Sequence, residues 1–351
     1  MLLLLSAAAV VFMLFGLALF YAGQTGEKSV TNTLLMSFGA FAVVLPLWNW
    51  IGFRIGFGTG DTVFLLFQGA FAVIATALIS GSVAERMKFG AWIAFAALWS
   101  VLVYAVLVRW TWNSEGWLFK LGAVDLAGGG PIHIASGAAG VVLAILLGQR
   151  LRPDAHARLN VPQVMLGAGI LTFGWIFFNA GSVLEVNDTA YRVALNTLLA
   201  AATGALGWFI ADSLRHQAVT ALSGASGAVA GLVAITPAAA TLNDWQSGLL
   251  GVAAAFAVYG ALQLKDRLPV DDALDVAAFH LVAGVVGSLS IGVVMGWHQL
   301  GVQALAVAVT IGYSAAATLL IGLLLKFLFG MRIDATVEQH GIDSVHRLGP
   351  N

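Results

Sequence analysis

The sequence predicts an all-α polytopic membrane protein with eleven transmembrane helices, arranged as two inverted five-helix repeats plus a final helix. Three observations predict this class. Hydrophobic residues make up 60% of the 351 residues and charged residues only 9%, a balance that soluble domains do not have. Apolar runs of membrane-spanning length recur from end to end. Two short sequence patterns also occur once in each half of the chain.

The eleven expected spans follow from the apolar runs and the short polar connections between them. The first run lacks a basic leading segment and is long for a signal peptide, so we expect it to be retained. The membrane domain would cover residues 1–329 and a cytoplasmic tail residues 330–351. Repeat one would take about 1–148, repeat two about 162–296 and helix eleven about 302–328. The expected spans are 2–22, 31–52, 62–83, 90–109, 131–148, 162–183, 191–211, 219–236, 247–264, 276–296 and 302–328.

The distribution of basic residues predicts orientation, because cytoplasmic loops carry an excess of Lys and Arg. With the N-terminus outside, twelve basic residues fall on the cytoplasmic side and four on the outer side. We therefore expect a multi-pass protein of the inner (plasma) membrane with a cytoplasmic C-terminus. The cytoplasmic set is Lys28, Arg86, Lys88, Arg150, Arg152, Arg158, Arg215, Lys265, Arg267, Lys326, Arg332 and Arg347, and the outer set is Arg54, Arg109, Lys120 and Arg192.

Composition also narrows the chemistry. The net charge of −1 gives no support for a nucleic-acid partner. The absence of cysteine excludes a thiolate nucleophile, a disulfide framework and a Cys-ligated metal.

The repeat rests on two matched patterns. Residues 16–23 and 174–181 both read G-x-x-x-F-[YN]-A-G, in the first and sixth spans. His133 and His280, in the fifth and tenth spans, are each followed by Gly at +4 and +7. Spans one to five thus correspond to spans six to ten. Since five is odd, the second copy must be inverted in the membrane, an arrangement typical of transport folds.

The two histidines are the first candidate site residues, because an ionisable side chain at bilayer depth is costly. On a helix, the histidine and its two glycines share one face, so another helix can approach beside the ring. His133 and His280 could each satisfy a local hydrogen bond between helices, or together line an apolar pore. Two histidines without further ligands make an incomplete metal site. An enzyme would need a nucleophile or acid beside them, which these spans lack, so we expect neither a metal, a cofactor nor catalysis.

Four further residues are candidates for holding a small cation. Phe71, Phe178, Ser182 and Trp112, the last just outside span four, could provide aromatic faces and one oxygen. The alternative is ordinary membrane packing, which accounts for most aromatic residues of the chain. Asp125, before span five, is better explained as a turn or capping carboxylate, although its charge could also attract cations to an outer mouth.

These residues resemble the ammonium transporter (Amt/Rh) superfamily, specifically its bacterial Amt branch. The resemblance covers nearly the whole chain and is carried by residues 16–23, 67–71, 84–89, 122–140, 174–182, 221–237 and 271–287. It implies eleven helices in two inverted halves, a homotrimer with one pore per subunit, and a possible P-II-type regulatory protein at the cytoplasmic face. The implied activity is uptake of ammonium, which is captured outside, deprotonated and passed through the pore.

The resemblance also implies a role for each matching residue. Trp112, Phe71 and Ser182 match the ammonium recruitment site, with Asp125 as a nearby supporting acid. Phe71 and Phe178 match a stacked phenyl gate. His133 and His280 match the twin pore histidines.

Several positions depart from the family pattern. Arg109 stands where a histidine is common, Leu281 where a glycine is usual, and the connection around residues 53–61 is short. The tail keeps only a loose version of the family pattern. These departures leave an alternative open: an ammonium sensor or receptor on the same fold, with little or no flux.

Overall fold

The computed structural model describes residues 1–151, 159–220, 222–265 and 267–345. Within these residues the regular structure is helical, apart from one isolated bridge between Met87 and Arg332. Arg152, Arg158 and Arg347, which entered the orientation argument, and tail residues 346–351 lie outside the described residues.

Several long helices contain π or 3-10 segments, labelled η, between α-helical parts. Because these parts continue one another, α2–η1–α3, α4–η2, α5–η3–α6, η4–α8 and η6–α13 each form one continuous helical run. The elements are α1 (Leu2–Ala22), α2 (Val30–Leu47), η1 (Trp48–Gly52), α3 (Phe53–Gly56), α4 (Thr62–Leu78), η2 (Ile79–Val83), α5 (Phe89–Trp99), η3 (Ser100–Tyr104), α6 (Ala105–Trp112), α7 (Trp117–Lys120), η4 (Gly129–Ile134), α8 (Ala135–Leu147), α9 (Val161–Gly181), α10 (Asp188–His216), α11 (Ser223–Ala238), α12 (Asp244–Lys265), η6 (Ala277–Val282), α13 (Ala283–Met295), α14 (Trp297–Phe329), α15 (Ala335–His340) and η7 (Ile342–Val345).

Ten helical segments of the described chain are long and apolar enough to cross a membrane. They coincide with ten of the eleven expected spans. The eighth expected span falls on α11, an apolar helix of 16 residues. One boundary was wrong: the fourth span does not end before Trp112, because α6 continues through that residue.

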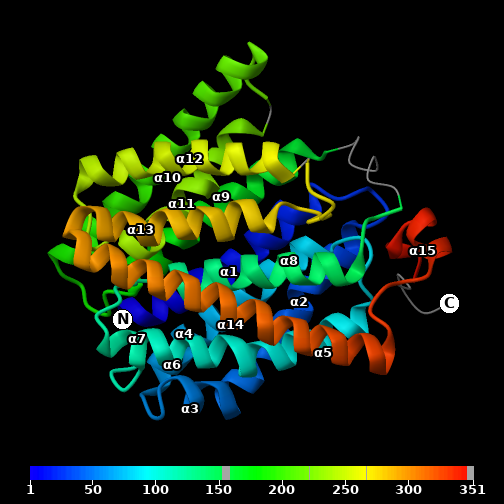
Figure 1. Ribbon diagram of the computed structural model, residues 1–351, viewed down its shortest axis with the longest axis horizontal. Coiled ribbons are helices and arrows are strands. Elements are labelled where there is room, and N and C mark those ends of the chain that lie inside the picture. The colour runs from blue at the N-terminus through cyan, green and yellow to red at the C-terminus, as the bar shows by residue number, and fades with distance from the viewer. Residues whose placement is uncertain (152–158, 221, 266, 346–351) are drawn as a thin grey trace.

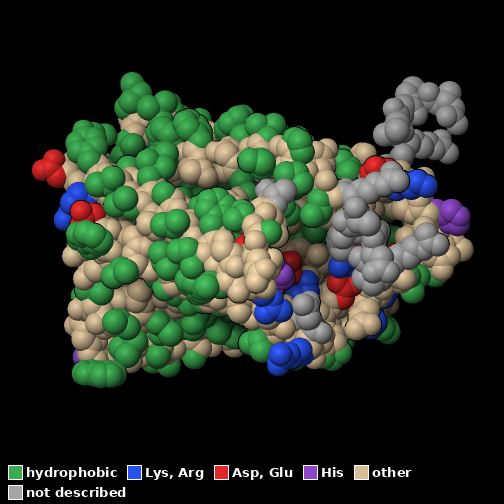
Figure 2. All heavy atoms as spheres, turned by 90° about the horizontal axis from the view of Figure 1, so that it is seen from above, with side chains coloured by type: hydrophobic (Ala, Val, Ile, Leu, Met, Phe, Trp, Pro, Cys, Tyr) green, Lys and Arg blue, Asp and Glu red, His purple; other side chains and the backbone are tan. Residues whose placement is uncertain are grey.

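The helices form one bundle with their long axes roughly aligned, and α7 and α15 lie at opposite ends (Figure 1). We call these the α7 end and the tail end. Hydrophobic side chains cover the middle of the face seen in Figure 2, and charged side chains gather toward the tail end, with a smaller group at the α7 end. Long stretches of α14 are exposed, including Leu320 and Phe327. Such a belt is stable only against lipid or another apolar surface.

Helices α1 and α9 cross antiparallel at the centre of the bundle, in close backbone contact. A side-chain carbon at Gly16 would lie 2.9 Å from the backbone nitrogen of Leu171, and one at Gly167 would lie 2.4 Å from that of Phe20. Only glycine permits this approach. The repeated pattern provides the contact from both sides, since Gly174 meets Met13 of α1 in the same way.

An ion cluster ties the elements together at the tail end. Arg150, which follows α8, donates to Glu85 at 2.8 Å and to Asp271 at 2.8 Å. Burial alone would raise the pKa of Asp271, but the hydrogen bonds and charge of Arg150 lower it to about 2. Because Asp271 precedes η6, this ion pair joins the ends of the two runs that carry His133 and His280.

The tail packs back onto the same end. Arg332 donates to the carbonyl of Leu147 at 2.8 Å and to the carboxylate of Glu338 at 2.9 Å. Asp343 accepts from the backbone N–H groups of Thr31 at 2.9 Å and Asn32 at 2.7 Å. The Asp343 carboxylate therefore caps the first turn of α2, although it lies far away in the sequence.

Candidate functional site

The two histidines meet inside the bundle. His133 lies in η4 and His280 in η6, so both occupy π-helical turns. Such turns are rare in proteins, and those that occur are often found at functional sites. Their Nδ1 atoms are 3.2 Å apart and their rings are nearly parallel, with centroids 5.3 Å apart. Both side chains are buried. The contact between the two halves that the repeated pattern predicts is therefore present in this structure.

The glycines that follow each histidine explain this contact. A side-chain carbon at Gly137 would lie 2.5 Å from the backbone nitrogen of Leu281. One at Gly284 would lie 3.4 Å from the Cβ of His133. The η4–α8 and η6–α13 runs can thus approach closely enough for the rings to touch. Leu281 contacts the backbone beside Gly137, at the crossing of the two runs.

The hydrogen bond between the rings restricts their protonation. One Nδ1 must donate and the other accept, so the pair shares a single proton at this contact. The Nε2 atom of His133 is buried without a hydrogen-bond partner. A neutral guest that can both donate and accept hydrogen bonds would satisfy it.

Trp175 of α9 holds the ring of His133 in place. The two rings stack with centroids 5.4 Å apart and an interplanar angle of 17°. The indole N–H of Trp175 donates to the hydroxyl of Thr236 at 2.8 Å. The sequence interpretation missed Trp175, although it lies one helical turn before Phe178 in the repeated pattern.

The two phenyl rings lie directly beside the histidines. Phe71 of α4 and Phe178 of α9 stack with centroids 4.1 Å apart and an interplanar angle of 15°. Phe178 lies 6.3 Å from His133 between ring centroids. The stacked pair therefore lies next to His133. The stacking of these two rings is what the resemblance implied, while their role as a gate stays a prediction.

A hollow of about 170 Å³ opens on the far side of the phenyl rings, toward the α7 end. Phe71, Trp112 and Ser182 all line it. Trp112 and Phe71 are 6.3 Å apart between ring centroids. The hydroxyl of Ser182 donates to the carbonyl of Phe178 at 2.9 Å, which leaves its oxygen lone pairs for a cation.

Gln68 also lines this hollow, which we call the mouth, and was not singled out from the sequence. It lies one turn before Phe71 on α4, and its side-chain oxygen is buried without a hydrogen-bond partner. An oxygen acceptor beside two aromatic faces suits a small cation that carries N–H donors.

Asp125 lies beside the mouth but is held by the backbone. Its carboxylate accepts from the N–H groups of Gly128 at 2.7 Å, Gly129 at 2.9 Å and Gly130 at 2.7 Å. It thereby caps the start of η4. Burial raises the pKa of Asp125, and these hydrogen bonds oppose the rise. The backbone carbonyl of Asp125 accepts from the indole N–H of Trp112 at 2.8 Å, so the Asp125 loop positions that ring.

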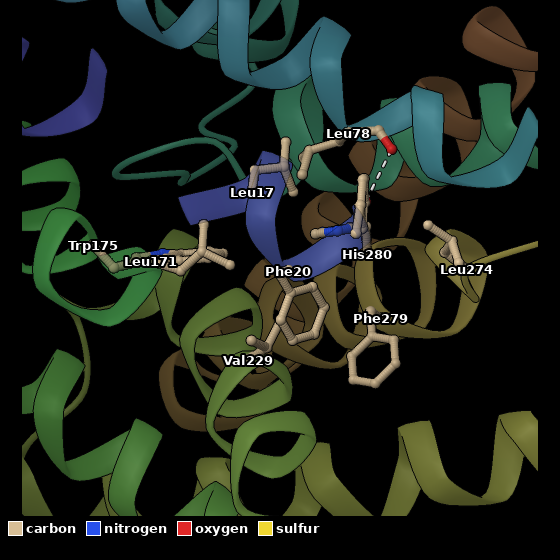
Figure 3. Close-up of a pocket in the computed structure, with 10 residues that line it drawn as sticks. Leu17, Phe20, Leu78, Leu171, Trp175, Val229, Leu274, Phe279 and His280 are labelled. Atoms are coloured by element: carbon tan, nitrogen blue, oxygen red, sulfur yellow. Dashed lines mark hydrogen bonds between the residues drawn. The ribbon is translucent and has the colours of Figure 1, made fainter. Parts of the chain in front are cut away.

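A further cavity lies beside His280, toward the tail end. Its volume of about 10 Å³ has room for roughly one water-sized molecule. Figure 3 shows His280 at its wall, with Leu17 and Phe20 of α1 on one side and Phe279 on another. Tyr21 donates to the carbonyl of Leu78 at 3.0 Å, the dashed line in that view. The walls here are almost wholly apolar.

No group of three or more His, Cys, Asp or Glu side chains that could hold a metal occurs in the part of the chain that the structure describes.

Arg109, a departure from the family pattern, is exposed and lies with its guanidinium 3.5 Å from the carbonyl of Ile55. Its charge is therefore directed to the α3 side of the mouth.

A bundle of membrane-length helices enclosing an aromatic mouth, stacked phenyl rings and paired imidazoles defines a membrane transport protein. Comparison with known proteins specifies the family. The model of the Ammonium Transporter Family matches residues 1–62 and 58–348. The chain belongs to this family.

Relatives and solved structures agree with this assignment. An ammonium transporter of Aquifex aeolicus is 41% identical over 385 residues, which cover 98% of this chain and 90% of the relative. One from Mycobacterium tuberculosis is 38% identical, with coverages of 97% and 87%. The Sensor Amt Protein has a TM-score of 0.92 at 27% identity, covering 98% of this chain and 97% of that one. Mep2 of Saccharomyces cerevisiae has a TM-score of 0.87 at 29% identity, with coverages of 95% and 89%.

Proposed function

We propose that this protein moves ammonium across the membrane by capturing the cation at the mouth and removing a proton. Neutral ammonia and the proton then pass the histidine pair separately and recombine on the other side, so that each transported ammonium carries one net charge across. The observation that carries the proposal is the unbroken row from Trp112 through Phe71, Phe178 and His133 to His280. Each member contacts the next or lies within 6.3 Å of it between ring centroids.

Capture depends on replacing water around the cation. The mouth is wide enough for an ammonium ion with part of its hydration shell. The faces of Trp112 and Phe71 would supply cation–π attraction, and the oxygens of Ser182 and Gln68 would accept N–H bonds. The Asp125 loop would support this site by holding Trp112, without contacting the ion.

Deprotonation provides selectivity. Carrying an intact cation past the phenyl rings costs many kcal/mol, because nothing beyond them replaces the lost water. Desolvation favours the neutral form of a bound ammonium. Ammonia can then donate and accept hydrogen bonds along the imidazoles. Potassium has no proton to release, so it stays at the mouth.

We further propose that α11 is the eighth of eleven spans and that the two halves are inverted repeats. Sixteen residues of α-helix span about 24 Å, slightly less than a bilayer core. Since α11 is almost entirely buried by its neighbours, it need not match the lipid thickness. The reciprocal contacts of α1 and α9 support the inversion.

The surroundings of the subunit follow from the same assignment. We place the α7 end outside and the tail end in the cytoplasm of a cell bounded by this inner membrane. The exposed apolar faces suit lipid and a homotrimer. The packed tail offers a cytoplasmic surface where a P-II-type regulatory protein could dock.

Electrical recording on proteoliposomes tests the transport proposal and separates it from the sensor alternative. Purified protein should give a saturable current on ammonium pulses and none on potassium pulses. A variant that removes both rings, His133→Ala with His280→Ala, is the control for a pore-dependent current. Ammonium binding without any current would reject transport and favour a sensor.

A further inference from the structure

A second small cavity lies behind the Asp125 loop, and its lining residues differ from those of the mouth and of the cavity beside His280, apart from the loop itself. Its volume is about 20 Å³, enough for roughly one water molecule. Its wall includes Asp125, Thr111 of α6, Ser288 of α13 and Thr310 of α14. The Asp125 loop and three helices, α6, α13 and α14, therefore converge on this small space.

The three hydroxyl groups in its wall lack partners. Thr111, Ser288 and Thr310 are 7%, 5% and 2% exposed, and their hydroxyls have no hydrogen-bond partner among the described residues. Hydroxyls on membrane helices usually bond a carbonyl of their own helix, as Thr203 does with Leu199 at 2.8 Å. Three unpaired hydroxyls around one space indicate a polar guest, since each unsatisfied group costs free energy.

Asp125 has room for one more hydrogen bond. Its Oδ1 accepts from two amides, those of Gly128 and Gly129, and its Oδ2 accepts from Gly130. A carboxylate oxygen offers two lone pairs, so Oδ2 can accept one further donor. The hydroxyl of Thr310 and this oxygen both border Gly130, because a side-chain carbon at Gly130 would be 3.3 Å from the Asp125 Oδ2 and 3.6 Å from the Thr310 hydroxyl.

The guest must be neutral. The three amides that donate to the carboxylate belong to the start of the η4–α8 run, and they already offset its negative charge, so the cavity needs no cation to balance it. A water molecule needs two to four polar partners, which are present.

We propose that this cavity is a binding site for one ordered water molecule, which donates to Asp125 Oδ2 and bridges the Asp125 loop to the hydroxyls of α13 and α14. Through this bridge, Thr310 acts as a positioning residue for the mouth. The Asp125 carbonyl holds the indole of Trp112 at 2.8 Å, so a shift of the loop moves that ring. The effect on the mouth rests on the proposed function, whereas the water site does not.

The test compares Thr310→Val, which removes the hydroxyl at nearly constant volume, with Thr310→Ser, which keeps it. Thr203→Val is the matched control, because its hydroxyl bonds within its own helix. High-resolution structures of the full protein should show one water peak in the unaltered protein, the control and Thr310→Ser, and none in Thr310→Val. Half-saturating ammonium should rise about two- to tenfold in Thr310→Val alone, with the saturating current retained, as expected for one lost hydrogen bond.

Three results would overturn the proposal: an empty cavity in the unaltered protein, a water peak that persists in Thr310→Val, or an anomalous signal in the cavity after soaking with thallium, which would identify a monovalent cation. Should Thr310→Val not fold, Ser288→Ala tests the same cavity by the same peak. Absence of any ammonium current would instead reject the proposed function and leave the water peak as the measure of this site.

Discussion

The ion pair between Arg150 and Asp271 should make the free energy of unfolding of this protein depend on pH in the acidic range. The substitution Asp271→Asn should remove this dependence. The pKa of Asp271 is lowered from 3.8 to about 2 in the folded protein. A group with a depressed folded pKa contributes its full stability above the unfolded value, and this contribution is lost as pH falls through the folded value. The relevant window therefore runs from about pH 4 down to pH 2.

The size of the effect follows from the shift. Each pKa unit corresponds to about 1.4 kcal/mol, so the shift gives about 2 kcal/mol before screening. Because water reaches part of this cluster, we expect about 1–2 kcal/mol. Asp271→Asn should be less stable than the unaltered protein by that amount above pH 5, and the two should converge near pH 2.

The assay is the free energy of unfolding in mixed micelles, measured by titration with a denaturing detergent across this pH range. Asp334→Asn removes an exposed carboxylate at the same end and serves as the control. A difference between Asp271→Asn and the unaltered protein that stays constant from pH 5 to pH 2 would refute the assigned pKa.

Three further predictions concern the path and the tail. His133→Ala or His280→Ala should change the ammonium current or its selectivity over potassium. The free energy of unfolding should fall by only roughly 1–3 kcal/mol, seen as a drop of a few degrees in the thermal midpoint in detergent, because the surrounding helices remain packed. Loss of folding would contradict this prediction. Trp112→Leu should raise half-saturating ammonium about three- to thirtyfold through lost cation–π attraction, measured by current titration, and an unchanged value would remove Trp112 from the capture site. Arg332→Ala breaks its bonds to Leu147 and Glu338, so limited proteolysis should cut the tail after Gly330 faster than in the unaltered protein, and equal rates would show that Arg332 does not hold it.

The positions of the helices were predictable because membrane-length apolar runs define them without reference to the rest of the fold. The meeting of His133 and His280 was also predictable, since glycines at +4 and +7 permit close approach only on the face that carries the ring. The boundary at Trp112 was missed because a helix can continue past the point where its apolar run ends.

Supporting residues were harder to predict. Trp175 and Gln68 lie within motifs that the sequence interpretation used, but their roles depend on which way each ring or amide points across a helix interface. Asp125 illustrates the opposite case. Its preference for capping follows from the glycines after it, whereas its hold on Trp112 acts through a backbone carbonyl, which no side-chain pattern reveals.

The facing Nδ1 atoms of the two imidazoles have a consequence for timing. Suppose that a proton enters at Nε2 of the donor ring, the shared proton passes between the Nδ1 atoms, and a proton leaves Nε2 of the acceptor ring. Each ring then ends in the opposite tautomer, and the Nδ1 that donated now accepts. A second hop in the same direction must wait until both rings exchange their protons or turn over. The pair would thus transfer one proton at a time, and the tautomers of both rings would have to be restored before the next transfer.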